Sequence, residues 1–192
     1  ISSSILDSEI LLSKTLNKTR EEILTNIDQK IDKKKVLLFK KYLQRRSKNE
    51  PIAYILGEKE FWSSTFYVNN NTLIPRPETE LLVDNLLEFY RNKNISILDI
   101  GTGSGCIIVS LLINLKKSIG FGVDISKDAI LIATKNSNKH KLANRIKFST
   151  QSFEKIFNKK FDLIVSNPPY IERKDIKNLS DDIKKNEPRM AL

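Results

Sequence analysis

The first 58 residues place apolar side chains at the three- and four-residue spacing of short amphipathic helices. Apolar residues gather over 5–12, and Thr19 followed by Glu22 forms a capping box that predicts the start of a second helix. A third helix is predicted over 32–47. The pattern indicates a small helical domain over residues 1–58. The third helix carries Val36, Leu37, Phe39 and Leu43 on its apolar face and Lys33, Lys34, Lys35, Lys40, Lys41, Arg45 and Arg46 on the other.

The pattern changes over residues 59–74, where aromatic and β-branched residues flank Ser63 and Ser64 and an asparagine-rich turn follows. This arrangement is typical of a β-hairpin, which we expect to link two domains. The next segment has proline at a plausible first helical position and acidic residues in the first turn. We expect a helix there whose apolar face includes Leu82, Leu86 and Phe89.

From residue 95 onward, apolar strand-like runs alternate with helical runs. Such alternation predicts an α/β domain, over residues 75–192, with a parallel sheet and helices on both of its faces. The strands are predicted at 95–100, 120–125, 145–150 and 161–167, and the helices at 106–115 and 127–138.

A glycine-rich turn, Gly-Thr-Gly-Ser-Gly at 101–105, lies where the first of these strands gives way to a helix. Glycine permits a tight turn and lets a ligand approach the backbone, and a helix N-terminus presents free amide donors. Asp124 ends the second strand, where a carboxylate can accept hydrogen bonds from both hydroxyls of a ribose. The GxGxG spacing differs from the GxGxxG of pyrophosphate-binding folds and favours a nucleoside cofactor such as S-adenosylmethionine. The alternative is a structural turn with Asp124 as a simple cap.

The segment Asn167-Pro168-Pro169-Tyr170 follows the fourth strand and should face the same crevice as the glycine turn. An amide nitrogen is a poor nucleophile, so a catalyst that methylates it should hold its N–H bonds with acceptors and favour the charge developing on nitrogen. The Asn167 side-chain oxygen and the Pro168 carbonyl can be those acceptors, and Tyr170 offers a ring on which a planar group can stack. We therefore predict Asn167, Pro168 and Tyr170 as catalytic residues. The alternative is a proline-terminated strand whose asparagine caps a turn.

Composition narrows the possible chemistry. The 192 residues are 40% apolar, enough to bury a core, and no run has the length of a membrane helix, so we expect a cytoplasmic protein. The single cysteine and single histidine exclude an internal disulfide and a Ser-His-Asp triad, and we predict no metal site. The net charge of +10 suggests nucleic acid as a partner, but the abundance of Lys, Ile and Asn is typical of a general compositional bias. The basic helix face is either solvated or a patch for an anionic partner.

Several single side chains allow two interpretations. Cys106 could be a reactive thiolate at a helix start, but we expect a buried apolar role. We expect His140 to be solvated and Trp62 to pack within the hairpin rather than stack on bases. Arg76 could form a structural ion pair with Glu78, or the two could border the active site.

Five segments together resemble a single family. They are similar to the release-factor glutamine methyltransferases, the PrmC/HemK family, whose members have a small N-terminal helical domain, a β-hairpin link and a Rossmann-like methyltransferase domain that uses S-adenosylmethionine. The resemblance covers essentially the whole chain, although NPPY alone is shared with adenine-N6 DNA methyltransferases and some RNA enzymes. The segments are LIPRPETELLV (73–83), ILDIGTGSGCI (97–107), GVDIS (122–126), VSNPPYI (165–171) and NEPRMAL (186–192).

The resemblance implies roles for particular residues. The glycine turn would pass close to the methionine part of the cofactor, Asp124 would hold its ribose, Phe153 would lie against its adenine, and Asn167 would lie between cofactor and substrate. Ser152 stands where relatives commonly have an acid. The implied cofactor residues are Gly101, Thr102, Gly103, Ser104, Gly105, Asp124, Phe153 and Asn167, and the implied substrate residues are Asn167, Pro168, Pro169 and Tyr170.

The family's substrate is the Gly-Gly-Gln loop of peptide chain release factors, so we expect N5-methylation of that glutamine by a monomeric enzyme with no nucleic-acid substrate. The family continues beyond residue 192, so we expect an incomplete sheet, and some relatives carry a second methyltransferase module. One alternative is a methyltransferase for an exocyclic amine of nucleic acid, of the adenine-N6 type, for which the sequence has no target-recognition insertion. Another is a catalytically incomplete fragment that binds cofactor or release factor.

Overall fold

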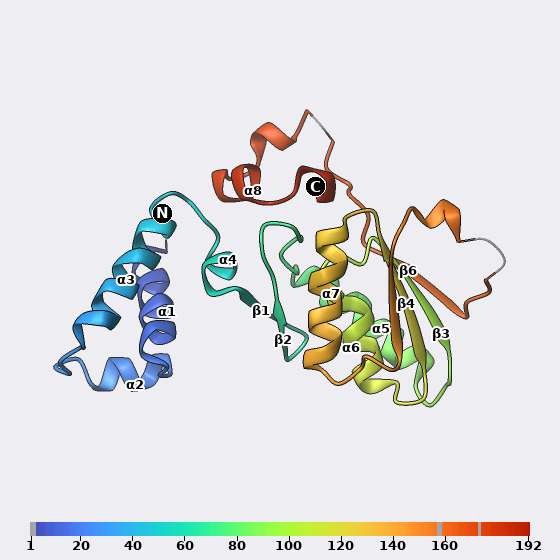
Figure 1. Cartoon of the computed structure of the whole chain (residues 1–192), viewed down its shortest axis with the longest axis horizontal. Helices are drawn as coiled ribbons and strands as arrows, with labels where there is room; N and C mark the ends of the chain where they lie inside the picture. Colours follow the sequence, from blue (N-terminus) through green and yellow to red (C-terminus); the bar gives the residue numbers. More distant parts are fainter. Residues whose placement is uncertain (1–2, 157–158, 173) are drawn as a thin grey trace.

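The N-terminal part of the chain is helical. The computed structural model describes residues 3–156, 159–172 and 174–192. The first four helices are α1 (Ser4–Leu16), α2 (Arg20–Thr25), α3 (Lys33–Arg46) and α4 (Ile52–Leu56). The predicted capping box is present, because Thr19 Oγ1 accepts from Glu22 N at 3.2 Å and Glu22 Oε2 accepts from Thr19 N at 2.7 Å. In Figure 1 α1, α2 and α3 form one end of the molecule, away from the sheet.

This helical part is held together partly by ion pairs. The Arg46 Nε donates to Asp7 Oδ2 at 2.7 Å between α3 and α1, and both side chains are largely buried. Arg45 likewise forms an ion pair with Glu50. Two of the basic residues predicted on one face of α3 therefore pair with carboxylates of this chain. Leu37, predicted on the apolar face, is instead 67% exposed, because three short helices do not cover every apolar position.

The predicted hairpin consists of β1 (Glu58–Phe61) and β2 (Ser64–Tyr67), paired antiparallel. Trp62 and Ser63 turn the chain with φ of 46° and 55°, the left-handed conformation that two-residue hairpin turns need. The hairpin packs on the α/β part: Asn136 of helix α7 (Lys127–Lys139) accepts from Tyr67 N at 2.7 Å. His140 also contacts the hairpin, with Nε2 3.1 Å from the Thr65 carbonyl oxygen. The prediction that His140 is merely solvated was wrong.

The sheet has four parallel strands in the order β5-β4-β3-β6. The strand order reverses beside β3, because β4 and β5 lie on one side of it and β6 lies on the other. In this class of fold, ligands bind at the carboxyl ends of the strands next to such a reversal, here β3, β4 and β6. The strands are β3 (Ser96–Ile100), β4 (Ile119–Asp124), β5 (Ile146–Thr150) and β6 (Leu163–Ser166).

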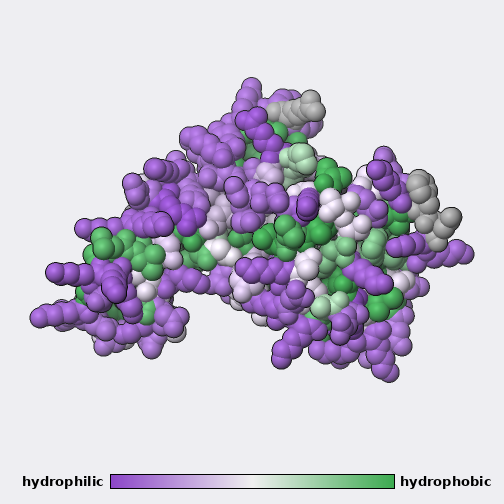
Figure 2. All heavy atoms as spheres, viewed as in Figure 1, coloured by the Kyte–Doolittle hydropathy of each residue, from purple (hydrophilic) through white to green (hydrophobic). Residues whose placement is uncertain are grey.

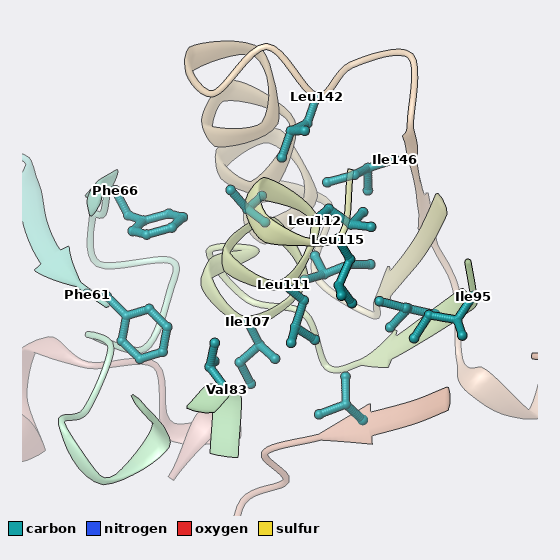
Figure 3. Close-up of a cluster of buried hydrophobic side chains, with 14 residues drawn as sticks. Phe61, Phe66, Val83, Ile95, Ile107, Leu111, Leu112, Leu115, Leu142 and Ile146 are labelled. Carbon is teal, nitrogen blue, oxygen red and sulfur yellow. The ribbon is translucent and has the colours of Figure 1, made fainter. Parts of the chain in front are cut away.

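Three helices pack in one layer beside the sheet, namely α5 (Glu78–Tyr90), α6 (Cys106–Asn114) and α7. Helix α6 is central and almost entirely buried, and its Leu111 and Leu112 lie among the side chains of Figure 3. Helices on both faces were expected, but the longer helices of the described α/β part all lie in this layer. Phe89 of α5, predicted on its apolar face, is 66% exposed.

The final described segment returns across the molecule toward the helical part (Figure 1). It contains η2 (Ile176–Asn178), α8 (Asp181–Asn186) and η3 (Arg189–Ala191), and the preceding short helix η1 (Phe153–Lys155) follows β5. Ile171 N donates to Leu192 O at 2.9 Å, which closes the segment into a loop. Asn186 Nδ2 donates to Asn49 O at 3.1 Å, which ties α8 to the end of α3.

Hydrophilic residues predominate on the face shown in Figure 2, with apolar residues visible in small groups between them. Within residues 3–156, 159–172 and 174–192, no helix is both long and apolar enough to cross a membrane.

Candidate functional site

A cavity of about 700 Å³ lies at the carboxyl ends of β3, β4 and β6. Most residues predicted for the site line it, although they come from segments separated by up to 68 positions in the sequence, from Gly101 to Pro169 (169 − 101 = 68). Gly105 and Tyr170 are the two predicted residues absent from its wall. The predicted residues in the wall are Gly101, Thr102, Gly103, Ser104, Asp124, Phe153, Asn167, Pro168 and Pro169.

The glycine turn adopts the left-handed conformation that its sequence predicts. Gly101, Gly103 and Gly105 have φ of 68°, 55° and 77°, values that a residue with a Cβ adopts only with strain. A Cβ on Gly101 would meet nothing within 4 Å, so this part of the turn is open. A Cβ on Gly105 would lie 3.2 Å from Ala133 Cβ, so this glycine lets α6 approach α7. Its role in the fold is close packing beneath the turn.

Asp124 is held at the end of β4 by two backbone amides. Its Oδ2 accepts from Gly103 N at 3.0 Å, and its Oδ1 accepts from Ser126 N at 2.9 Å. A carboxylate oxygen has further lone pairs, so both oxygens can accept again from a ligand in the cavity. The two amides fix the direction of the carboxylate and leave each of its oxygens able to accept another hydrogen bond.

Beneath the glycine turn lies Asp99, a carboxylate that the sequence interpretation missed. It is 1% exposed, its Oδ2 accepts from Thr102 Oγ1 at 2.7 Å, and its Oδ1 has no partner in the described part of the chain. Burial raises the pKa of Asp99 to about 7, with the nearby Asp124 charge a smaller contribution in the same direction. A single acidic residue inside the apolar strand ILDI was the signal that could have identified it. The Thr102 hydroxyl therefore points to Asp99.

Cys106 begins α6 and lines the cavity. Burial raises the pKa of its thiol to about 12, with the Asp99 charge a further contribution. A raised pKa agrees with the predicted apolar role, but the side chain is partly buried and not fully buried as expected.

Phe153 stands on η1, directly after β5, and its ring is 55% exposed in the cavity wall. Ser152 caps this short helix, since its Oγ accepts from Glu154 N at 3.4 Å. Gln151 N donates to Asp124 O at 2.9 Å and so links β5 to the end of β4. The ring and the Asp124 carboxylate thus lie on neighbouring strand ends.

Asn167 enters the cavity from the end of β6. Its Nδ2 donates to Thr79 Oγ1 of α5 at 3.4 Å, a contact that sequence reasoning did not predict. Its Oδ1 accepts no hydrogen bond from any residue that the structure describes, so this oxygen is available to a ligand. Tyr170 is 76% exposed and outside the cavity wall, so its stacking role stays a prediction.

Part of the cavity wall comes from two segments that are distant in the sequence. Arg76 lies beside Pro188 and Arg189 in this wall, and its Nη2 donates to Glu187 Oε1 at 2.7 Å. The ion pair predicted between Arg76 and Glu78 is wrong, because the partner of Arg76 lies 111 residues away. In the alternative interpretation Arg76 and Glu78 both border the active site; Arg76 does line the cavity, but Glu78 is not among the residues of its wall.

Comparison with known proteins agrees with this architecture. Residues 1–57 match the family model of the PrmC N-terminal domain, and residues 77–186 match that of the methyltransferase small domain. The catalytic domain of hMettl16, solved in complex with MAT2A 3'UTR hairpin 6, has a similar fold, with a TM-score of 0.50 and 19% identity over 66% of this chain and 46% of that chain.

Three curated relatives illustrate the similarity in sequence. A release factor glutamine methyltransferase of Buchnera aphidicola subsp. Schizaphis graminum is 45% identical over 92% of this chain and 64% of its own length. One of Nitratidesulfovibrio vulgaris is 39% identical over 97% of this chain and 64% of its own length. A bifunctional methyltransferase of Rickettsia conorii is 39% identical over 100% of this chain and 42% of its own length. The chain thus spans less than two thirds of each of these relatives.

These matches confirm the resemblance inferred from the five motifs. The larger match covers more than half of the chain and contains the glycine turn, Asp124 and Asn167. The chain belongs to the methyltransferase small domain family, and in this chain a domain of the PrmC N-terminal type precedes the methyltransferase domain.

Proposed function

We propose that the whole protein transfers a methyl group from S-adenosylmethionine to the side-chain nitrogen N5 of a glutamine, in the Gly-Gly-Gln loop of peptide chain release factors. The observation that carries the proposal is the presence of Asn167, Asp124 and the glycine turn in one cavity of about 700 Å³. A volume in this range suits a nucleoside cofactor together with a small substrate group. The names of relatives about 40% identical support the choice of glutamine.

The residues of the cavity fit the cofactor. Asp124 offers two oriented acceptors for ribose hydroxyls, and the open backbone at Gly101 and Gly103 leaves room for the methionine part. Phe153, with its exposed ring, would contact adenine. When bound, S-adenosylmethionine supplies the electrophilic methyl group. The remaining proposed cofactor residues in the wall are Thr102, Ser104 and Asn167, and Gly105, which lies outside the wall, would act by allowing the tight turn.

The chain's own groups would orient the substrate amide. Asn167 Oδ1 and the Pro168 carbonyl would accept its two N–H bonds and thereby turn the nitrogen lone pair toward the methyl donor. Two acceptors would also stabilise the positive charge that develops on nitrogen as the C–N bond forms and the bond from sulfur to the methyl group breaks. The nitrogen would then lose one proton to water, and the products would be the N-methylated amide and S-adenosylhomocysteine. The contact of Asn167 Nδ2 with Thr79 Oγ1 would hold the Asn167 carboxamide in this orientation. Pro169 and Tyr170 would complete the surface around the glutamine.

The test is methyl transfer by the whole protein from labelled S-adenosylmethionine to a release factor, with its Gly-Gly-Gln glutamine intact or replaced by alanine. We expect label in the intact factor alone, and a loss of about 100- to 1,000-fold in kcat for Asn167→Ala, since one charge-stabilising group is removed. Asn138→Ala, on the exposed side of α7, is the matched control. Label that ignores the replacement refutes the proposed substrate, and transfer to an adenine-containing oligonucleotide supports the nucleic-acid alternative. A cytoplasmic location, a monomeric state and the domain boundaries at 58/59 and 74/75 stay predictions.

A further inference from the structure

A second cavity, of about 350 Å³, lies where three parts of the chain meet. Arg45 and Glu50 contribute from the end of α3 and the loop after it, Asn70 from the turn after the hairpin, and Lys185 and Asn186 from α8. The bond from Asn186 Nδ2 to Asn49 O, at 3.1 Å, holds α8 against the helical part and so closes one side of this cavity.

The charged side chains of the second cavity are already paired. Arg45 Nε donates to Glu50 Oε2 at 2.8 Å, and Arg45 Nη2 also donates to Tyr54 O at 3.1 Å. Lys185 Nζ donates to Asp181 Oδ2 at 2.6 Å. Because Arg45 is neutralised by Glu50 and Lys185 is directed to Asp181, which it shares with Lys184, the cavity favours a neutral polar ligand over a phosphate or a carboxylate.

Two carboxamides remain able to bind such a ligand. The hydrogen bonds of the turn run between Asn69, Asn71 and Thr72 and leave the exposed Asn70 side chain out, among the residues that the structure describes. Asn186 donates only from Nδ2, to Asn49 and Asp182, so its Oδ1 is free within the same residues. The Asn70 carboxamide offers one acceptor and two donors and can therefore bond both groups of a peptide unit, whereas Asn186 offers its Oδ1 to a peptide N–H.

Asn70 also lines the larger cavity, so the two cavities meet at this residue. A peptide whose glutamine side chain occupies the larger cavity can therefore extend its main chain past Asn70 into the second cavity. We propose that the second cavity is a subsite for the main chain of the protein substrate beside the methylated glutamine, bound by the carboxamides of Asn70 and Asn186. The proposal rests on the proposed function and adds to it a reason why a glutamine within a loop is preferred to an isolated one.

The test compares two substrates with the whole protein: a peptide of the Gly-Gly-Gln loop with several residues on each side of the glutamine, and N-acetylglutamine methylamide. The quantity measured is the kcat/KM of the loop peptide divided by the kcat/KM of N-acetylglutamine methylamide. We expect Asn70→Ala to lower this ratio about tenfold through the KM of the longer peptide, as the loss of one or two hydrogen bonds implies. Asn186→Ala should act similarly, and Asn138→Ala should leave the ratio unchanged.

Asn186→Ala also removes the hydrogen bond to Asn49 and could therefore prevent folding. In that case the test depends on Asn70→Ala, since the Asn70 side chain is exposed. An unchanged ratio in Asn70→Ala overturns the subsite. Binding of the fluorescein-labelled peptide in the presence of S-adenosylhomocysteine separates the two proposals. Wild-type protein that binds the peptide without methylating any glutamine refutes the proposed function, and the subsite then stands or falls on whether Asn70→Ala weakens this binding about tenfold. Wild-type protein that binds no peptide overturns the subsite.

Discussion

The Arg76 guanidinium donates to the Glu187 carboxylate at 2.7 Å, and the two residues are 111 positions apart in the sequence. The Glu187 side chain is only 1% exposed and also accepts from Ile74 N at 3.4 Å. Residues 188–191 follow directly in the wall of the larger cavity, so this pair fixes the wall to the start of α5. Burial raises the pKa of Tyr54 in α4, and the negative charge of Glu187 raises it further. The Glu187 carboxylate therefore lies close to the helical part as well.

Arg76→Met should reduce the free energy of unfolding by about 3 kcal/mol, because it leaves a buried carboxylate without its cation. Urea unfolding of the wild type and the variant measures the difference. Glu187→Gln should cost about 1 kcal/mol, since the amide keeps part of the hydrogen bonding. Lys174→Met, which breaks the exposed pair with Glu172, is the control and should cost less than about 1 kcal/mol. Equal losses in Arg76→Met and Lys174→Met would show that the buried pair does not stabilise the wall.

Gly105→Ala should destabilise the protein more than Gly57→Ala does. Both glycines have a positive φ, 77° and 75°, so both variants have the same backbone strain of about 1 kcal/mol. Only the Cβ at residue 105 meets Ala133 atoms at 3.2 and 3.3 Å, which adds an overpacking cost of about 2 kcal/mol. Thermal and urea unfolding give the free energy of unfolding of both variants. The difference between them is the cost of the contact with Ala133, since backbone strain is common to both. Equal destabilisation would mean that α6 and α7 separate at little cost.

Asp99 should make stability depend on pH near neutrality. Its pKa is raised to about 7 from an ordinary value of 3.8, so between these values the native state holds a proton that the unfolded chain has released. Raising the pH through this window therefore favours unfolding, by up to about 1.4 kcal/mol per pH unit. We expect the stability of Asp99→Asn relative to wild type to increase from pH 5 to 7 and then level off. Urea unfolding at several pH values measures it, and a flat difference would contradict the raised pKa. Asp128→Asn, on the exposed first turn of α7, is the control.

Asp124→Asn should weaken the binding of S-adenosylhomocysteine by about 10- to 100-fold, because charge-assisted hydrogen bonds to the ribose become neutral or are lost. The new amide group would also face Gly103 N or Ser126 N, both of which are donors. Titration calorimetry on the whole protein gives the affinity. Asp128→Asn removes the same charge near the same helix start but lies outside the cavity wall. A similar loss in both variants would indicate a long-range effect of charge in place of direct contact.

Several features could be predicted because their signals are local. The capping box at Thr19 and Glu22, the hairpin turn and the strands before Gly101 and Asp124 each depend on residues within a few positions of one another. The carboxyl ends of parallel strands also lie at one edge of a sheet, so the sequence pattern alone predicts that Asn167 lies near the glycine turn. These predictions failed where a residue's environment depended on a distant segment. The interpretations of His140, Leu37 and Phe89 were wrong for that reason.

By itself, the sequence determined the glycine turn, the family and the order of the elements apart from short ones such as α4 and α8, because backbone preferences and motif spacing are properties of short segments. The tertiary structure alone decided that Arg76 pairs with Glu187 and not Glu78, that Asp99 lies unpartnered on one oxygen beneath the turn, and that Asn70 joins two cavities. The reason is physical: desolvation and close contact between remote segments arise only once the chain has folded, and they set which charges pair and which polar groups remain available to a ligand.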